Sequence, residues 1–278
     1  MYNVKLLNKI SETGLSIFPE ENYNISEDVE NPDAILVRSC NMHDMELGSN
    51  LKAIARAGAG VNNIPIDRCT EKGIVVFNTP GANANGVKEL VFAALFLSSR
   101  KIVQGINWAQ SLKGQGDAVE AKIEKGKSSF EGPEIKGKKL GVIGLGAIGA
   151  MVANDAVALG MEVGGYDPFI SVDTAWNLSR EVIRETSLEH LLATSDYITI
   201  HVPLVDDTKG MINKEKIALM KKGVRIINLA RGGLVVDDDI LEALENGTVA
   251  CYVTDFPNEK LLGNDKVITI PHLGASTP

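Results

Sequence analysis

Three spaced glycines, Gly144, Gly146 and Gly149, stand near the middle of the chain. A short apolar run precedes them and an apolar helical pattern over Ala147–Leu159 follows, which is the strand–turn–helix context in which Gly-x-Gly-x-x-Gly has a use. Gly144 permits the tight turn, Gly146 lets a pyrophosphate approach the backbone, and Gly149 lets the helix pack on the strand. Because a helix N-terminus favours phosphates, the segment predicts a dinucleotide site.

A second feature of this site is the carboxylate of Asp167, which directly follows the apolar run Glu162–Tyr166. An acidic residue about 20 positions after the glycine turn accepts hydrogen bonds from the ribose hydroxyls and repels a 2′-phosphate, so we expect NAD rather than NADP. His201 ends another apolar run at the same predicted face, and its neighbours Val202 and Pro203 are expected to wall the adenine. The alternative is that the glycines serve only a turn and Asp167 only a strand end.

Two series of short apolar runs must position these residues. The first comprises Val4–Leu7, Ala34–Val37, Ala53–Ala55 and Val75–Phe77, and the second comprises Leu140–Ile143, Glu162–Tyr166, Tyr197–His201, Val224–Asn228, Ala250–Val253 and Val267–Ile270. A helical pattern covers Lys88–Leu112, and the polar stretch Lys113–Ser129 is expected to be an exposed arm or loop. The alternation predicts an α/β protein with two doubly wound parallel-sheet domains, 1–98 and 99–278, joined near Ser98, of which the second is a Rossmann dinucleotide-binding domain.

Composition restricts the classes of partner. The formal net charge of −8 argues against nucleic acid and anionic membranes as partners. Cys40, Cys69 and Cys251 match no zinc or disulfide spacing, so we expect reduced thiols, no metal site and a cytoplasmic location. The polar N-terminus lacks the apolar run of a signal peptide, and no apolar stretch reaches the roughly 18 residues of a membrane helix.

The order of the motifs carries a resemblance to a known family. The glycine segment is followed by His201-Val-Pro-Leu204, then by Asn228-Leu-Ala-Arg231-Gly-Gly-Leu-Val, and then by Pro271-His272-Leu-Gly274. This order resembles the D-isomer-specific 2-hydroxyacid dehydrogenases over nearly the whole chain. Segments around Arg38, around Arg56 and at Phe77-Asn-Thr-Pro80 are most similar to the phosphoglycerate dehydrogenases of that family. The resemblance implies NAD-dependent hydride transfer at C2 of a small 2-hydroxy acid.

The resemblance also implies three catalytic residues. A bidentate arginine should hold the substrate carboxylate, and Arg231 matches the family's arginine. A histidine should exchange the hydroxyl proton, and His272 matches the family's histidine. Glu259 matches the glutamate that orients this imidazole and favours its protonated form. Each has a structural alternative: an exposed turn for Arg231, a structural histidine for His272 and a solvated loop residue for Glu259.

Further site residues come from the same matches. Beside the cofactor the resemblance adds Ala147, Ile148, Thr208, Ala230 and Asp255. The family's nicotinamide-contacting aspartate aligns with Thr254 and Asp255 comes next, which leaves the contact open between these two. The expected substrate anchors are Arg38, Ser39, Arg56, Gly58, Ala59, Gly60 and Asn83, where the arginines would oppose a phosphate and the glycine loop would present N–H groups to an anion. A salt bridge or solvated side chain is the alternative for each arginine.

These observations leave several functions open. The leading hypothesis is oxidation of D-3-phosphoglycerate to 3-phosphohydroxypyruvate, the entry to serine synthesis. The alternatives are a reductase for glyoxylate, hydroxypyruvate or another 2-keto acid, and a non-enzymatic NAD-sensing corepressor-like binder; Glu259 argues against a formate dehydrogenase. The family also implies a homodimer through the cofactor domain, with Lys101–Ser129 at the interface. Family members continue beyond the position of Pro278 with a segment that returns to the first domain, so we expect a flavodoxin-like first domain lacking that segment.

Overall fold

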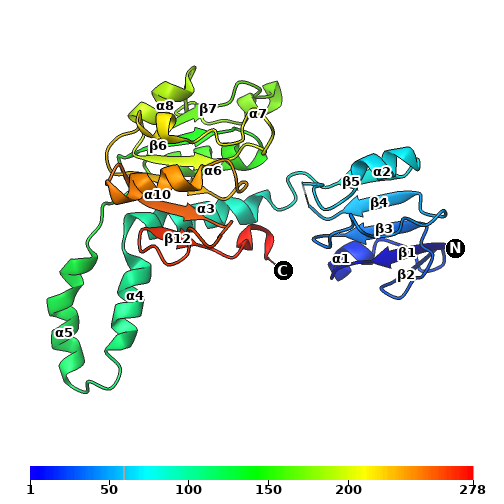
Figure 1. Ribbon diagram of the computed structural model, residues 1–278, viewed down its shortest axis with the longest axis horizontal. Helices are drawn as coiled ribbons and strands as arrows, with labels where there is room; N and C mark the ends of the chain where they lie inside the picture. The colour runs from blue at the N-terminus through cyan, green and yellow to red at the C-terminus, as the bar shows by residue number, and fades with distance from the viewer. Residues whose placement is uncertain (59, 278) are drawn as a thin grey trace. The chain divides into compact units, whose positions relative to one another are not determined.

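The computed structural model describes residues 1–58 and 60–277, which form two compact units, 1–83 and 84–277 (Figure 1). The boundary falls between Asn83 and Ala84, and not near Ser98 as the sequence suggested. The reason is helix α3 (Ala84–Ser99), whose Val91 and Leu95 are buried in the core of the second unit. Ser98 lies near the end of this helix, and its carbonyl accepts a hydrogen bond from Arg225 Nε at 2.8 Å. The whole helix therefore belongs to the second unit.

The first unit is built on a five-stranded parallel sheet. Its elements are β1 (Tyr2–Leu6), α1 (Glu12–Leu15), β2 (Tyr23–Ser26), β3 (Ala34–Val37), β4 (Ala53–Arg56), α2 (Ile66–Glu71) and β5 (Val75–Asn78). The strand order β2-β1-β3-β4-β5 is that of flavodoxin-like folds. Ile35, Val37 and Ile54 from the two central strands are buried with Met42 and Leu47 from the connection between them. Strands β3 and β4 therefore supply the centre of this core, and their packing fixes the position of the strand ends and of the residues that directly follow them.

The second unit is built on a seven-stranded parallel sheet. Its strands are β6 (Lys139–Ile143), β7 (Glu162–Tyr166), β8 (Ile183–Arg184), β9 (Tyr197–Ile200), β10 (Val224–Asn228), β11 (Val249–Thr254) and β12 (Val267–Thr269). The order is β12-β11-β10-β9-β6-β7-β8, so the chain first moves outward from β6 through β7 and β8 and then crosses back to β9. This is the Rossmann arrangement, with its switch point between β6 and β9. The predicted fold class is confirmed for both units.

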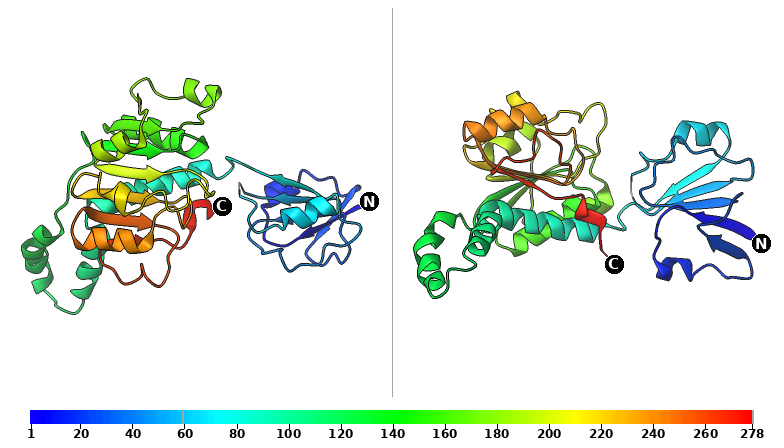
Figure 2. Two further views of the ribbon diagram at one scale, coloured as in Figure 1. Left: turned by 45° about the horizontal axis from the view of Figure 1, so that its top comes forward. Right: turned by 60° about the horizontal axis from the view of Figure 1, so that its bottom comes forward.

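Helices cover both faces of this sheet, which explains why its strands are apolar without alternation (Figure 2). One face packs on α3 and α6 (Ala147–Ala158), and its core includes Leu140, Val142 and Val163. The other face packs on α8 (Leu188–Thr194), α9 (Lys214–Ile217) and α10 (Asp237–Glu245), with Ile198 and Ile226 in its core. The short helices α7 (Val172–Trp176) and η2 (Leu273–Ala275) complete the unit.

The segment after α3 differs from the expectation of one helical pattern over Lys88–Leu112, and of the two alternatives for Lys113–Ser129, an exposed arm or a loop, it forms the arm. Helix α3 ends at Ser99, and two further helices follow, α4 (Ile102–Ser111) and α5 (Ala118–Gly126), with the short η1 (Lys127–Phe130) after them. The rings of Trp108 on α4 and Phe130 on η1 lie 5.2 Å apart and hold the end of the second arm of the hairpin against the first. Figure 1 shows this α4–α5 hairpin projecting away from the seven-stranded sheet. The polar segment is therefore a helical arm.

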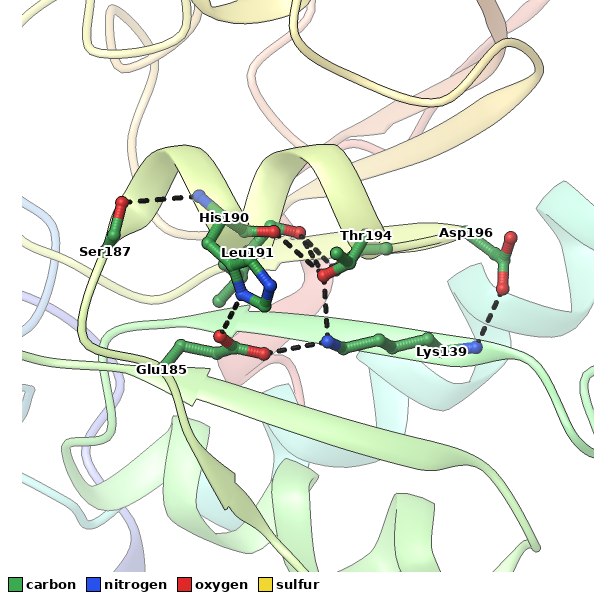
Figure 3. A network of polar contacts seen from close by, with 8 residues as sticks. Lys139, Glu185, Ser187, His190, Leu191, Thr194 and Asp196 are labelled. Carbon is green, nitrogen blue, oxygen red and sulfur yellow. Dashed lines mark hydrogen bonds and ion pairs between the residues drawn. The ribbon is translucent and has the colours of Figure 1, made fainter.

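A buried ion pair fastens β6 to the loop after β8 (Figure 3). Glu185 is 6% exposed and accepts hydrogen bonds from Lys139 Nζ at 2.7 Å and from His190 Nδ1 at 2.6 Å. Lys139 Nζ also donates to Thr194 Oγ1 at 2.8 Å. The missing side chain of Gly164 makes room, since a Cβ there would lie 2.8 Å from Glu185 Oε1. These hydrogen bonds overcome the raising effect of burial and lower the pKa of the Glu185 carboxyl.

Two structural features are absent from the described part of the chain. No helix there is both long enough and apolar enough to cross a lipid bilayer. No group of three or more His, Cys, Asp or Glu side chains there is arranged to hold a metal ion.

Candidate active site

The carboxyl ends of parallel strands meet at one edge of a sheet, and in the second unit this edge carries the predicted site residues. Six neighbouring strands contribute. They supply the glycine turn after β6, Asp167 after β7, His201 after β9, Ala230 and Arg231 after β10, Asp255 after β11 and His272 after β12. The topology therefore gathers along one edge residues that are far apart in the sequence.

The glycine turn has the geometry that its spacing predicts. Gly144 has a φ of +89°, which L side chains rarely adopt, and its N–H donates to Tyr166 O at 2.9 Å. A Cβ on Gly149 would lie 1.9 Å from Gly144 O, so only glycine fits where α6 crosses the turn. Gly146, the N-cap of α6, differs from both, because a Cβ there would meet no protein atom within 4 Å. Protein packing thus explains Gly144 and Gly149 and leaves open space in front of Gly146.

Asp167 holds the turn in place. Its Oδ2 accepts the Leu145 N–H at 2.8 Å and its Oδ1 accepts the Phe169 N–H at 2.8 Å. Each carboxylate oxygen keeps a further lone pair, so the same side chain can also accept from a ribose hydroxyl. The carboxylate is half-buried and therefore still open to a ligand on one side. Asp167 thus braces the loop that the sequence assigns to the pyrophosphate.

His201 lies at the switch point between β6 and β9. Its backbone N–H donates to Ile143 O at 2.7 Å, and its ring Nε2 lies 2.9 Å from Thr199 Oγ1. Its Nδ1 is buried without a hydrogen-bond partner in the described part of the chain. Burial lowers the pKa of the imidazole to about 4, so the ring is neutral at physiological pH. A neutral ring suits the wall of a cofactor site and does not suit a proton donor.

The loop after β9 closes on itself beside this histidine. Thr208 Oγ1 donates to Pro203 O at 2.6 Å and accepts the Val205 N–H at 2.9 Å. Val202 packs against the core of the α8–α10 face, whereas Pro203 is exposed. Thr208 therefore shapes the loop whose residues were expected to face the adenine.

These observations fit a bound dinucleotide. The open space before Gly146 faces the N-terminus of the twelve-residue helix α6, where N–H groups and the helix dipole favour a phosphate. The buried and unpartnered Nδ1 of His201 lies at the neighbouring strand end. Gly146, Asp167 and His201 would therefore hold the pyrophosphate, ribose and adenine portions respectively.

Arg231 follows β10 in a loop that Asn228 fixes. Asn228 is 1% exposed; its Nδ2 donates to Arg231 O at 2.9 Å, and its Oδ1 accepts the Ala230 N–H at 3.2 Å. The Arg231 side chain is half-buried, and its Nη1 donates to Ala230 O at 2.6 Å. Asn228 thus sets the direction in which the guanidinium leaves the sheet.

Asn228 is a site residue that the sequence reasoning did not single out. Its signal was present, since it is a polar residue that ends an otherwise apolar strand and directly precedes the arginine loop. Its role could not be read from that position, because the Asn228 amide is satisfied mainly by backbone groups of a loop whose path the sequence does not show.

His272 is brought to this edge in an uncommon conformation. It has φ 46° and ψ 48°, and among the described residues it is the one non-glycine with a positive φ. Its backbone N–H donates to Ile270 O at 2.9 Å, and its ring packs edge-on against Phe256 with centroids 4.9 Å apart. Such left-handed residues concentrate at functional sites. The imidazole is exposed, and a substrate can reach it.

Glu259 is not brought to His272 in this structure. It is exposed in the turn after Phe256, and no hydrogen bond or ion pair of the described residues includes it. Asp255, which directly follows β11, is 3% exposed, and the charges of His272 and Arg231 act on its carboxylate. Burial raises the pKa of the Asp255 carboxyl, against the opposing effects of these two residues. The role of Glu259 stays a prediction.

The expected substrate anchors lie in the first unit, after β3 and β4. Arg56 Nε donates to Arg38 O at 3.0 Å, and Arg56 Nη1 donates to Gly60 O, so the arginine ties the two strand ends together. The N–H groups of Arg38 and Ser39 both donate to Asn8 Oδ1 at 2.9 Å.

The glycine loop after β4 differs from the expectation of free N–H groups. The Gly58 N–H donates to Thr79 Oγ1 at 2.8 Å, so it is already used within this unit. Asn83 is half-buried at the end of the unit, and Ala59 lies outside the described residues. The arginine side chains therefore remain the main cationic candidates here.

Comparison with known proteins supports one family. Residues 92–274 match the family model described as D-isomer specific 2-hydroxyacid dehydrogenase, NAD binding domain. The chain is 37% identical to a D-3-phosphoglycerate dehydrogenase of Bacillus subtilis over 100% of its own length and 54% of that protein. It is 40% identical to a hydroxypyruvate reductase of Thermotoga maritima over 88% of its own length and 78% of that protein.

The solved structures agree with this match. A 3-phosphoglycerate dehydrogenase of Entamoeba histolytica, determined with NAD⁺ bound, superposes with a TM-score of 0.76 at 26% identity and covers 99% of this chain and 89% of that one. The chain spans about half the length of the curated phosphoglycerate dehydrogenases that it matches.

Proposed function

Because the chain belongs to the D-isomer-specific 2-hydroxyacid dehydrogenase family, with its second unit as the NAD-binding domain, we propose that it oxidises D-3-phosphoglycerate to 3-phosphohydroxypyruvate. One observation carries this proposal: Arg231 and His272 stand at the same sheet edge as the glycine turn. NAD, when bound, accepts the hydride from C2. Side chains of this protein bind the substrate and exchange the hydroxyl proton.

The proposed roles follow from charge and position. Arg231 binds the substrate carboxylate with paired hydrogen bonds and fixes the orientation of C2. His272 takes the hydroxyl proton as the hydride leaves C2, and returns a proton to the ketone oxygen in the reverse direction. His201 does not compete for this role, because burial lowers its pKa to about 4, which makes its ring too weak a base to hold the hydroxyl proton at neutral pH. Asp167 disfavours a 2′-phosphate and so selects NAD over NADP.

The phosphorylated substrate is the finer part of the proposal. Arg38 directly follows β3 and Arg56 is the last residue of the neighbouring strand β4, and one hydrogen bond links them. Two guanidinium groups at adjacent strand ends are a suitable site for a dianionic phosphate. The curated relatives named phosphoglycerate dehydrogenase support the same substrate, and their reaction would place this chain at the entry to serine synthesis.

The experiment follows NADH absorbance at equal concentrations of 3-phosphohydroxypyruvate and hydroxypyruvate. We expect a clear preference for the phosphorylated ketone, and Arg38→Ala should reduce that preference about tenfold or more while leaving turnover of hydroxypyruvate similar. A matched control is Arg68→Ala, which removes an arginine of α2 in the same unit. Equal or faster turnover of hydroxypyruvate by the parent would contradict the phosphorylated substrate.

A second candidate is a reductase for unphosphorylated 2-keto acids. The observation in its favour is the hydroxypyruvate reductase of Thermotoga maritima, which matches at 40% identity over 78% of its length. The occupied N–H of Gly58 also removes one donor from a phosphate site. This candidate predicts the opposite substrate preference in the same assay.

A homodimer through the α4–α5 hairpin is the remaining part of the proposal. Ile102, Val103 and Ile106 on α4 and Ile123 on α5 are each more than a third exposed, which is costly unless another surface covers them. A molar mass of about twice 29.8 kDa by light scattering would support the dimer. The monomer mass would contradict it.

A further inference from the structure

One side-chain oxygen near the end of β1 accepts three backbone N–H groups of the first unit. Asn8 lies two residues after β1. Its Oδ1 accepts the N–H groups of the three consecutive residues after β3, which are Arg38, Ser39 and Cys40, at 2.9, 2.9 and 3.0 Å. Only the oxygen of the amide can accept these bonds, since the amide nitrogen is a donor. The orientation of the Asn8 side chain is therefore fixed by the turn that it binds.

This arrangement decides which groups at the strand ends can bind an anion. Successive N–H groups that converge on one point form a concave site suited to an anion, and here Asn8 Oδ1 occupies it. The Gly58 N–H after β4 is used in a similar way by Thr79 Oγ1. A substrate phosphate at this edge would therefore be bound by side chains, and the direction of those side chains depends on how the turn after β3 is held.

The carbonyl groups of the same turn are held from the opposite side. Arg38 O accepts Arg56 Nε at 3.0 Å, and Cys40 O accepts Nδ2 of the buried Asn63 at 2.8 Å. Arg56 ends β4 and Asn63 lies in the loop that follows it. In the sheet β3 lies between β1 and β4, so one neighbouring strand supplies the acceptor for the N–H groups and the other supplies the donors for the carbonyls.

The Asn8 oxygen is the contact on which most of the turn depends. If it is removed, three N–H groups lose their acceptor together, whereas loss of Arg56 or Asn63 frees one printed carbonyl contact each. Backbone donors without a partner cost free energy, so the turn would rearrange to reach water. A displacement of about 1 Å is enough to weaken a positioned contact to substrate severely.

We propose that Asn8 is the positioning residue of the turn formed by Arg38, Ser39 and Cys40, and that it sets the direction in which the Arg38 side chain leaves β3 toward the substrate phosphate. Asn8 itself contacts no substrate in this role and acts through the backbone. The inference rests on the proposed function for the role of Arg38. An aspartate at position 8 would serve equally, because a carboxylate oxygen accepts the same N–H groups. A leucine of similar size would not.

The first test reads the turn directly and requires no turnover. Hydrogen exchange of the amides of residues 38–40 is measured by NMR in the parent, in Asn8→Leu and in Asn8→Asp. The matched control is Asn24→Leu, since Asn24 is an exposed asparagine of β2 in the same unit. We expect exchange to accelerate about tenfold or more in Asn8→Leu and to stay at the parent rate in Asn8→Asp and Asn24→Leu.

Two outcomes of this test are decisive. Unchanged exchange in a folded Asn8→Leu variant overturns the inference, as does equally fast exchange in Asn24→Leu. If Asn8→Leu does not fold, Asn8→Ser takes its place, because the serine oxygen lies one bond closer to the backbone and falls short of the turn.

The second test separates a positioning role from a merely structural one. We expect Asn8→Leu to raise KM for 3-phosphohydroxypyruvate about tenfold, with kcat and the KM for hydroxypyruvate within about threefold of the parent. Asn8→Asp should restore the parent values, while circular dichroism and NADH affinity stay unchanged in every variant. An equal loss of kcat for both ketones, or no rescue by Asn8→Asp, overturns the positioning role. If the parent reduces neither ketone, the proposed function fails, and the exchange rates still decide the inference.

Discussion

Glu185 and Asp255 are two carboxylates of the same unit that are almost equally buried, at 6% and 3% exposure. Glu185 receives hydrogen bonds from Lys139 at 2.7 Å and His190 at 2.6 Å, and its pKa is lowered. Asp255 has an unpartnered Oδ1, and its pKa is raised. Burial raises the pKa of both, so hydrogen bonding decides the difference. A buried charge that is fully paired supports the fold, whereas one left unpaired points to a ligand.

The largest effect on folding is expected when the paired carboxylate is neutralised. Glu185→Gln leaves the ammonium of Lys139, whose side chain is 14% exposed, without its charged partner. Removing one member of a buried ion pair costs about 3 kcal/mol of the free energy of unfolding. Urea denaturation measures this loss, and NADH binding should be retained because the pair lies away from the glycine turn. A change below about 0.5 kcal/mol would show that the ion pair is not structural.

The two carboxylates should contribute to the free energy of unfolding with opposite dependence on pH, and Glu185 is the stabilising one. The folded-state pKa of Glu185 lies below its ordinary value of 4.5, so its contribution to stability is present above pH 4.5 and is lost as pH falls through the folded-state value. The stability difference between the parent and Glu185→Gln should therefore shrink in acid. Denaturation at pH 7 and at about pH 3 measures it, and a constant difference would contradict the assigned pKa direction.

Neutralising Asp255 should change the free energy of unfolding less than neutralising Glu185 does, and in the opposite direction. Because its carboxyl pKa is raised on folding, the ionised group costs stability above that pKa, and Asp255→Asn should raise the free energy of unfolding at pH 7 by about 1 kcal/mol. A substitution that stabilises the fold and impairs the reaction is typical of functional sites. Thermal denaturation checks it, and a loss as large as that of Glu185→Gln would make Asp255 a structural residue.

The contrast also shows what the sequence could predict. Apolar runs placed β11, the strand that Asp255 follows, and every other described strand except β2 and β8, with strand ends shifted by at most two residues, and the glycine spacing placed the turn. Strand β8 (Ile183–Arg184), which Glu185 follows, was missed because two residues are too short to form a recognisable apolar run. Strand β2 was missed because Tyr23–Ser26 is partly polar and forms an edge of its sheet. The domain boundary was predicted near Ser98, too far toward the C-terminus, because no local signal in the sequence shows which unit α3 packs against.

Pairing between distant residues was not predictable at all. Lys139 and Glu185 are separated by 46 positions, and only the topology that puts β6 beside β7 and β7 beside β8 joins them. Likewise the burial of Asp255 depends on β12 lying beside β11, which no local segment of the sequence shows. Motifs identified the edge of the sheet, and packing decides which side chain is held there.

NADH fluorescence titration tests whether the open space before Gly146 holds the pyrophosphate of NAD. Gly146→Val is compared with Gly14→Val, since a Cβ meets no protein atom within 4 Å at either glycine. We expect both variants to keep the unfolding midpoint of the parent, Gly14→Val to keep its affinity for NADH, and Gly146→Val to lose at least about tenfold in NADH affinity. We also expect the parent to bind NADPH more weakly than NADH. Unchanged NADH affinity in a folded Gly146→Val variant would contradict this placement of the pyrophosphate.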